Sequence, residues 1–250
     1  MSVRRIWRPS TLICLAVAVL IFVYAKPIAA LLYAKREVRN DAKLWVVPTP
    51  LRLVDAPHPA RKTMSYFGYE FESPWTEVKR ERKWESIAVF NFAGGQVISI
   101  LDPAHDVDEL QMMKQEATKR GGNLKSSFGD EATRSRYAML SKIWSLTPAD
   151  LRFFSSRQEM VTNSIFLTMK KTRMERIKGG LYSFDTGWLR GIQEGGPAQD
   201  DMVIIEAFDA RDHKIELWIG SEPGANPRPS QEDINRILHS LRPATATQTK

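Results

Sequence analysis

The 250-residue chain lacks most of the residues from which disulfide bonds, metal sites and redox centres are built. It has a single cysteine, Cys14, so no disulfide can form within the chain. Its four histidines do not stand at metal-ligand spacing, and no cysteine accompanies them. These histidines are His58, His105, His213 and His239. The sequence therefore predicts no metal site and no intrachain disulfide.

Sequence motifs of the common reaction types are also missing. There is no Gly-x-Ser-x-Gly and no Gly-x-Gly-x-x-Gly. Residues 121–126 (GGNLKS) partly match a phosphate loop, but they lack the glycine before Lys125 and follow a helical pattern. We predict no catalytic, cofactor-binding or metal-ligating residue and no cofactor. Whether the chain is an enzyme stays open, and the missing catalytic motifs favour a non-enzymatic protein.

The basic excess is confined to the first quarter of the chain. The net charge is +7, yet residues 1–62 hold eleven Lys and Arg against three Asp and Glu. Residues 63–250 hold 25 basic and 26 acidic residues and are nearly neutral. A nucleic-acid-binding domain would carry the basic excess itself, so we expect no nucleic-acid partner.

One apolar stretch, Thr11–Ala34, follows a short basic tail at residues 1–10 and is interrupted by Lys26-Pro27. As a helix it would span about 36 Å, enough to cross a hydrocarbon core of roughly 30 Å. We expect a single-pass transmembrane helix over residues 11–34, with the lipid bilayer as its partner. A cleavable signal peptide cut near Ala25 is the alternative. Basic residues lie on both sides of this stretch, so charge counting leaves its orientation open. We favour a cytoplasmic N-terminus, and hence a periplasmic C-terminal domain at the inner membrane, because a short basic tail is the usual arrangement of a signal anchor.

Residues 35–62 contain four prolines and little periodicity, which predicts an extended spacer. We expect a single globular domain at residues 63–243 and a disordered tail at residues 244–250. Runs of β-branched and aromatic residues predict strands at Tyr66–Glu72, Ile87–Phe92, Gln96–Leu101, Leu181–Phe184, Leu189–Gln193, Met202–Asp209 and Lys214–Gly220. Short polar or glycine-rich turns inside this set predict two hairpins, one around Gly94-Gly95 and one around residues 210–213.

Capping patterns predict the helices. They point to helices over Asp106–Arg120, Asp130–Trp144 and Ser156–Lys171, a start at Thr147-Pro148, and a last helix from Ser230 to Arg242. Strands joined by short turns favour antiparallel pairing, and grouped helices favour a covered sheet. The predicted fold class is α+β, with an N-terminal transmembrane helix followed by an antiparallel sheet with packed helices.

Acidic residues gather around one histidine, at Asp102, His105, Asp106, Asp108 and Glu109. Such a cluster could bind a hard cation or transfer protons through a carboxylate–histidine pair. Acidic residues also satisfy free N–H groups at a helix start, and that interpretation fits the pattern better.

Two basic runs, Lys79–Lys83 (KRERK) and Lys170–Lys178 (KKTRMERIK), have two interpretations as well. They could contact anionic lipid headgroups, or they could form a solvated face and a helix C-terminus. We favour the second interpretation.

An early aromatic strand followed by proline (Phe67–Trp75, FGYEFESPW) and a closing Ile237–Pro243 (ILHSLRP) resemble the PsbP/Mog1-like sandwich domain. That resemblance covers about a quarter of the chain and implies a binding or assembly module without a shared catalytic site. The helical middle, residues 107–178, departs from the family's pattern. The whole chain also resembles bacterial membrane-anchored proteins, and this implies no chemistry.

We therefore expect a membrane-tethered, non-catalytic periplasmic domain that binds another envelope protein or a ligand. An envelope hydrolase or transferase with scattered active-site residues is the alternative, with the Asp102–Glu109 cluster and His213 as contributors. If no histidine lies within hydrogen-bond reach of a carboxylate in a concave pocket, this alternative fails.

Overall fold

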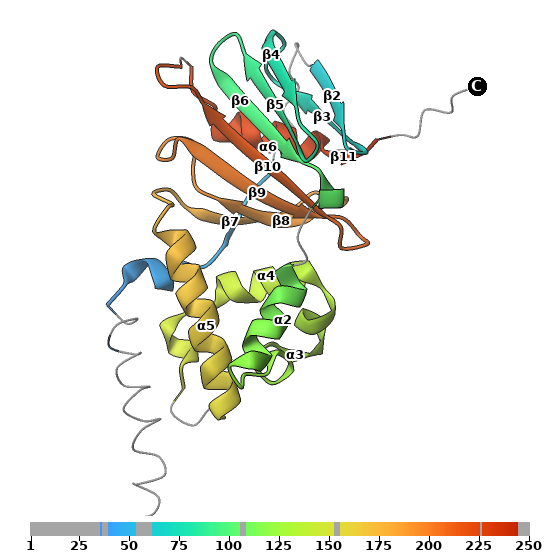
Figure 1. Cartoon of the computed structure of the whole chain (residues 1–250). Helices are drawn as coiled ribbons and strands as arrows, with labels where there is room; N and C mark the ends of the chain where they lie inside the picture. Colours follow the sequence, from blue (N-terminus) through green and yellow to red (C-terminus); the bar gives the residue numbers. More distant parts are fainter. Residues whose placement is uncertain are drawn as a thin grey trace, which may run out of the picture.

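The computed structural model describes residues 36, 40–53, 62–105, 109–152, 156–225 and 227–244. Figure 1 shows the strands gathered at one end of this part of the chain and the helices α2–α5 at the other. In sequence, the helices lie between the sixth and the seventh strand. The fold is α+β, and a helical layer interrupts the strands along the chain.

Within the described residues, eight strands form the main sheet in the order β1-β7-β8-β9-β10-β6-β5-β4. Their bounds are β1 Thr49–Pro50, β4 Val78–Lys83, β5 Ile87–Phe92, β6 Gln96–Leu101, β7 Leu181–Asp185, β8 Arg190–Glu194, β9 Met202–Phe208 and β10 Lys214–Ser221. The hairpins β5–β6 and β9–β10 confirm the two predicted from the turns. All neighbours pair antiparallel except β1, which runs parallel to β7.

The predicted fold, a transmembrane helix followed by an antiparallel sheet, is wrong in its sheet. The sheet is mixed, because Thr49 and Pro50 pair in parallel with Tyr182 and Ser183. Two residues in a proline-rich stretch give no strand pattern, so the sequence could not indicate this pairing. No helix in the described part of the chain is long and apolar enough to cross a membrane, and residues 11–34 lie outside that part.

A second, three-stranded sheet has the order β11-β3-β2 and contains β2 Lys62–Tyr66, β3 Tyr69–Ser73 and β11 Arg242–Pro243. The strand predicted at Tyr66–Glu72 is therefore a hairpin. Its turn is formed by Phe67 and Gly68, which both adopt positive φ. Helix α6, Gln231–Ser240, packs on β3 and begins at the predicted cap, Ser230.

The main apolar core lies between the main sheet on one side and α6 with the small sheet on the other. Alternate side chains of the central strands face it, among them Ile98, Ile205, Leu217 and, from α6, Ile237, which are at most 1% exposed. We call this side of the main sheet the core face. Because side chains alternate along a strand, the intervening residues point to the opposite, second face.

The helical layer consists of α2 Glu109–Lys119, α3 Leu124–Arg134, α4 Arg136–Ser145 and α5 Arg157–Met174, with the short 3-10 helices η1 Ala42–Trp45, η2 Pro103–His105 and η3 Pro148–Asp150. The helix predicted over Asp130–Trp144 is wrong, because the chain breaks at Ser135. Ser135 is extended, and its side chain accepts a hydrogen bond from the amide of Ala138. An N-cap of this kind starts a new helix.

Residues 41–53 belong to the stretch that the sequence presents as a spacer, yet they pack on the folded part. Leu44 is fully buried among the helices, and Lys43 donates to the carbonyl of Met174 over 2.9 Å. Lys170 of α5 is fully buried and donates to three carbonyl groups, those of Val46, Trp144 and Leu146. This lysine joins α5, the end of α4 and the chain that leads into β1.

Candidate functional site

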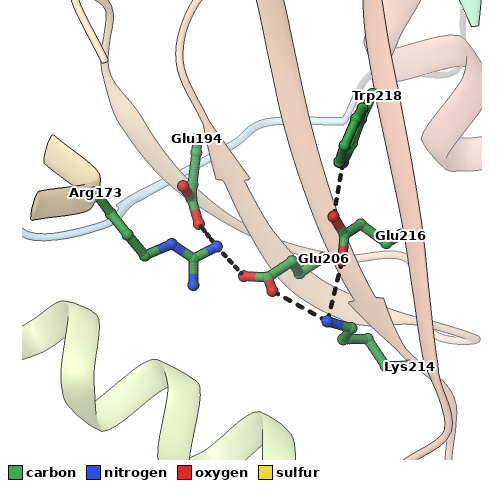
Figure 2. Close-up of polar contacts among 6 residues, drawn as sticks. All are labelled: Arg173, Glu194, Glu206, Lys214, Glu216 and Trp218. Atoms are coloured by element: carbon green, nitrogen blue, oxygen red, sulfur yellow. Dashed lines mark hydrogen bonds and ion pairs between the residues drawn. The ribbon is translucent and has the colours of Figure 1, made fainter. Parts of the chain in front are cut away.

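The second face of the main sheet carries charged side chains where the helical layer meets it. Leu181, Ile192 and Phe208 of the sheet pack there against apolar side chains of α4 and α5. Beside this contact the strands present Glu194 from β8, Glu206 from β9 and Lys214 from β10, which are 3%, 2% and 5% exposed. Figure 2 shows these groups in line with Arg173, Glu216 and Trp218. We call these six residues the charge chain.

Arg173 of α5 is the helical end of the charge chain. Its Nη2 atom lies 2.5 Å from Oε1 of Glu194 and 3.0 Å from Oε2 of Glu206. The Glu206 contact is a hydrogen bond, whereas Oε1 of Glu194 has an ion pair but no hydrogen bond. The Arg173 guanidinium also lies 5.2 Å from the centre of the Trp144 ring. Two buried carboxylates therefore share one guanidinium nitrogen.

Lys214 continues the charge chain into the sheet. Its ammonium lies 3.5 Å from Oε1 of Glu206 and 3.0 Å from Oε2 of Glu216. The other oxygen of Glu216 accepts a hydrogen bond of 2.6 Å from the indole N–H of Trp218. The strand register places Glu206 and Glu216 directly opposite each other on β9 and β10. The Lys214 ammonium lies against both carboxylates and offsets the repulsion between these two like charges. Opposite charges on neighbouring strands hold each side chain in place.

The environment of Glu194 favours its neutral form. Burial raises the pKa of its carboxyl group to about 8, although Arg173 acts in the opposite direction. The negative charges of Glu206 and Glu216, and the hydrogen bond with Glu206, raise the pKa further. Glu194 therefore holds a proton at neutral pH, and the remaining charges balance, with Arg173 and Lys214 against the two other carboxylates.

A pocket of about 210 Å³ opens where the charge chain reaches the end of β10. We call it the junction pocket. It is lined by Ser86, Ile87, Leu101, Asp102, Pro103, His105, Lys214 and Glu216. Four of these side chains carry ionisable groups, and they come from β6–η2 on one wall and from β10 on the other. A second cavity of about 20 Å³ lies on the helical side of Lys214, against Met139 and Phe208.

The structure brings two of the cluster residues predicted from the sequence together in this pocket. Nδ1 of His105 lies 3.2 Å from Oδ2 of Asp102, and Nε2 lies 3.7 Å from Glu85. The other oxygen of Asp102 accepts from the amide of Ala104, which fixes the carboxylate on η2. The pocket therefore contains a carboxylate–histidine pair, and the enzyme alternative meets its geometric condition.

No family model, curated protein or solved structure matches the chain. The PsbP/Mog1-like resemblance therefore stays a prediction. In the part of the chain that the structure describes, no three His, Cys, Asp or Glu side chains are grouped so that they could hold a metal ion.

The other predicted site residues are dispersed. Asp106 and Asp108 lie outside the described residues, and Glu109 is the first residue of α2. His213 stands in the β9–β10 turn, 3.0 Å from Asp209 and away from the residues that line the junction pocket. It is therefore held by its own turn rather than by the predicted site.

The two basic runs lie in different environments, one exposed and the other partly buried. Lys79–Lys83 lies in β4, an edge strand whose basic side chains are exposed. Lys170, at the start of the other run, points inward and is fully buried. The run Lys170–Lys178 is thus not wholly a solvated face, and Arg173 within it belongs to the charge chain.

The charge chain itself was not predicted from the sequence. A signal for it exists, because Glu206, Lys214 and Glu216 interrupt apolar strands at positions that alternate with the core residues Ile205 and Ile215. Alternation places such charges on one face. Alternation does not indicate that a helical layer covers this face. The charged side chains are buried because the layer covers them.

Proposed function

We propose that the chain is a non-catalytic binding or assembly module of the bacterial envelope, and that the junction pocket takes a small zwitterion such as a free amino acid. The observation that carries this proposal is the mixed charge of the pocket lining. Asp102 and Glu216 offer carboxylates to an ammonium group, while Lys214 and His105 offer donors to a carboxylate. Groups of both signs in one pocket favour a ligand that carries both charges.

The volume and the fixed lining support a small ligand. Pockets for drug-sized molecules measure roughly 300–1,000 Å³, and the junction pocket is smaller at about 210 Å³. Lys214 is held by Glu206 and Glu216, and Asp102 is held by the backbone of η2. Because these groups are oriented before a ligand arrives, little entropy is lost on binding.

Thermal unfolding of the full chain with added ligands tests the proposal. We expect the melting temperature to rise with the concentration of glycine, alanine or serine, and to respond less to acetate or methylammonium, because a bound ligand stabilises the folded state. Glu216→Gln should weaken the response, whereas Glu131→Gln on the exposed surface of α3 should leave it unchanged. Equal responses of the two variants, or none in the native chain, would contradict the pocket as a ligand site.

The periplasmic location and an envelope partner stay predictions. Cell fractionation followed by a pull-down of the full chain tests both. Recovery of the chain from the cytoplasm would contradict the location, and recovery of no specific protein would count against an assembly role.

One observation favours a second function, that of a hydrolase or transferase. The contact of His105 with Asp102 in the pocket has the geometry of a base and its orienting carboxylate. If it acts so, His105→Ala should abolish hydrolysis of a simple ester such as p-nitrophenyl acetate, and His213→Ala should not. Identical rates for both variants and for buffer alone would exclude the assignment.

A further inference from the structure

The second face of the main sheet continues beyond the charge chain as an apolar surface that the helices leave uncovered. Its side chains are Val89, Val97, Met202, Ile204 and Trp218, and all are at least partly exposed, Met202 by 49%. None of them belongs to the three buried apolar clusters of the described residues. We call this surface the open face. Ile87 and Leu101 connect it to the junction pocket.

The strand register shows how the open face is laid out. One row of directly opposed residues runs across five strands from β9 to β4: Ile204, Trp218, Ser99, Val89 and Arg82. The next row consists of Met202, Gly220, Val97, Asn91 and Arg80. Directly opposed residues share a face. The open face is therefore apolar in its middle and ends in two arginines on the edge strand.

The two arginines at the end of the open face have no partner among the described residues. Arg80 and Arg82 are exposed, and neither makes an ion pair with another described residue. Other surface arginines do, as Arg242 pairs with Glu70 and Arg236 with Glu232. In the same strand, Glu81 points to the core face and accepts from the hydroxyl of Tyr66. One carboxylate lies at this edge, because Glu222 accepts a hydrogen bond from Asn91, the residue opposite Arg80, but neither arginine forms an ion pair with it.

We infer that the open face docks an amphipathic helix of a partner protein, whose apolar side packs over Trp218 and Val89 and whose acidic flank meets Arg80 and Arg82. The inference goes beyond the proposed ligand in the junction pocket and does not depend on it. Helices bind apolar grooves through side chains that recur every three to four residues. The acidic flank follows from the charge of the two arginines.

The size of the open face favours a single helix over a second copy of the chain. The two rows cross five strands at a spacing of about 4.8 Å and lie two residues apart along each strand at about 3.3 Å per residue, which gives a patch of about 19 by 7 Å, or about 130 Å². A stable protein–protein interface buries about 800 Å² on each partner. A helix of about 14 residues is about 21 Å long, which matches the longer side of the patch.

Two synthetic 14-residue peptides test the inference with the full chain. Both carry leucine at helical spacing on one side, and their flanks carry glutamate in one and lysine in the other. We expect fluorescence anisotropy to show that the glutamate peptide binds the native chain about tenfold more tightly, since two exposed ion pairs contribute up to about 1 kcal/mol each. Arg80→Glu combined with Arg82→Glu should reverse this order.

A control and four contrary outcomes complete the test. Lys119→Glu combined with Arg134→Glu makes the same change of charge on exposed helical residues and should leave the order unchanged. No binding of either peptide, or equal binding of both, overturns the inference. A dimer in sedimentation that Val89→Asp dissociates assigns the face to a second copy, and binding to phosphatidylglycerol vesicles that Val89→Asp abolishes assigns it to a lipid surface. Each of these results also overturns it, and none bears on the amino acid response of the pocket.

Discussion

Arg173 on α5 and Glu194 on β8 are in direct contact, with Nη2 and Oε1 2.5 Å apart, and this contact joins the helical layer to the main sheet. The contact is buried on the Glu194 side, and Arg173 also bonds to Glu206. Buried charges of this kind are costly once a partner is removed. The stability of the junction should therefore depend on the charges on both sides.

Replacing Arg173 with methionine should lower the free energy of unfolding by about 3 kcal/mol, because Glu206 then keeps only Lys214 as a counter-charge. Urea denaturation followed by circular dichroism measures the change. Arg176→Met removes an exposed arginine one turn further on and should cost no more than about 0.5 kcal/mol. Equal losses for the two variants would show that the ion pair between Arg173 and Glu206 does not stabilise the fold.

The raised pKa of Glu194 predicts a stability that depends on pH. Its pKa is about 8 in the folded chain against an ordinary value of 4.5, so between these values the folded state binds the extra proton. This contribution is fully present below pH 4.5 and is lost as the pH rises to about 8, by up to about 1.4 kcal/mol per pH unit. Glu194→Gln keeps the neutral shape and should remove this slope.

Urea denaturation of the native chain and the Glu194→Gln variant from pH 5 to pH 8 measures the effect. The variant should gain on the native chain steadily as the pH rises. Burial lowers the pKa of Lys170 to about 8, but this group is present in both chains, so its contribution cancels when the two are compared. Glu131→Gln, an exposed substitution, should give a curve parallel to the native one. A parallel curve for Glu194→Gln would mean that Glu194 is ionised in the folded protein.

Sequence patterns correctly predicted the helices and hairpins that are determined by residues close together in the chain. The hairpin β5–β6 follows from Gly94-Gly95, and α6 follows from the cap at Ser230. The prediction was wrong where a short turn lies inside an apolar run. Phe67 and Gly68 form such a turn, and it separates β2 from β3. The prediction was also wrong at Ser135, whose capping role depends on where the next helix begins.

The candidate site was predicted only in part, because only some of its contacts join residues that are close in the chain. Asp102 and His105 stand three residues apart, so their contact is local and could be anticipated. Arg173, Glu194 and Lys214 meet only because the helical layer folds back onto the sheet, over contacts between residues far apart in the chain. Sequence periodicity gives the face of a charge, but it does not give what covers that face.

Lys170→Met should destabilise the fold by about 3 kcal/mol or more. The lysine ammonium donates over 2.7, 2.8 and 2.5 Å to the carbonyls of Val46, Trp144 and Leu146. Methionine has a similar volume but leaves these acceptors without a donor, and each unpaired buried group costs about 1–3 kcal/mol. Differential scanning calorimetry measures the loss. Lys171→Met, next in the chain and half-exposed, should cost far less, and a similar loss for both would contradict the role of the buried ammonium.

Asp212 ties the β9–β10 turn to the start of α4 and should contribute about 2 kcal/mol. Its Oδ1 atom accepts from the Ser135 hydroxyl over 3.0 Å and from the amide of Tyr137 over 3.2 Å, while Oδ2 accepts from the amide of Arg136. Asp212 has a φ of 66°, which Asn tolerates and Ala does not. Because a negative group at a helix N-terminus is stabilising, Asp212→Ala should cost about 2 kcal/mol and Asp212→Asn about half of that.

Hydrogen exchange at the amides of Arg136 and Tyr137 separates this tie from a general loss of stability. In Asp212→Ala these amides should exchange faster at a denaturant concentration where the core strands remain protected, because the variant frees the first turn of α4 before the sheet opens. Arg211→Ala changes an exposed neighbour in the same turn and should leave both amides as slow as in the native chain. Equal acceleration in the two variants would show that the turn, rather than the Asp212 carboxylate, protects the start of α4.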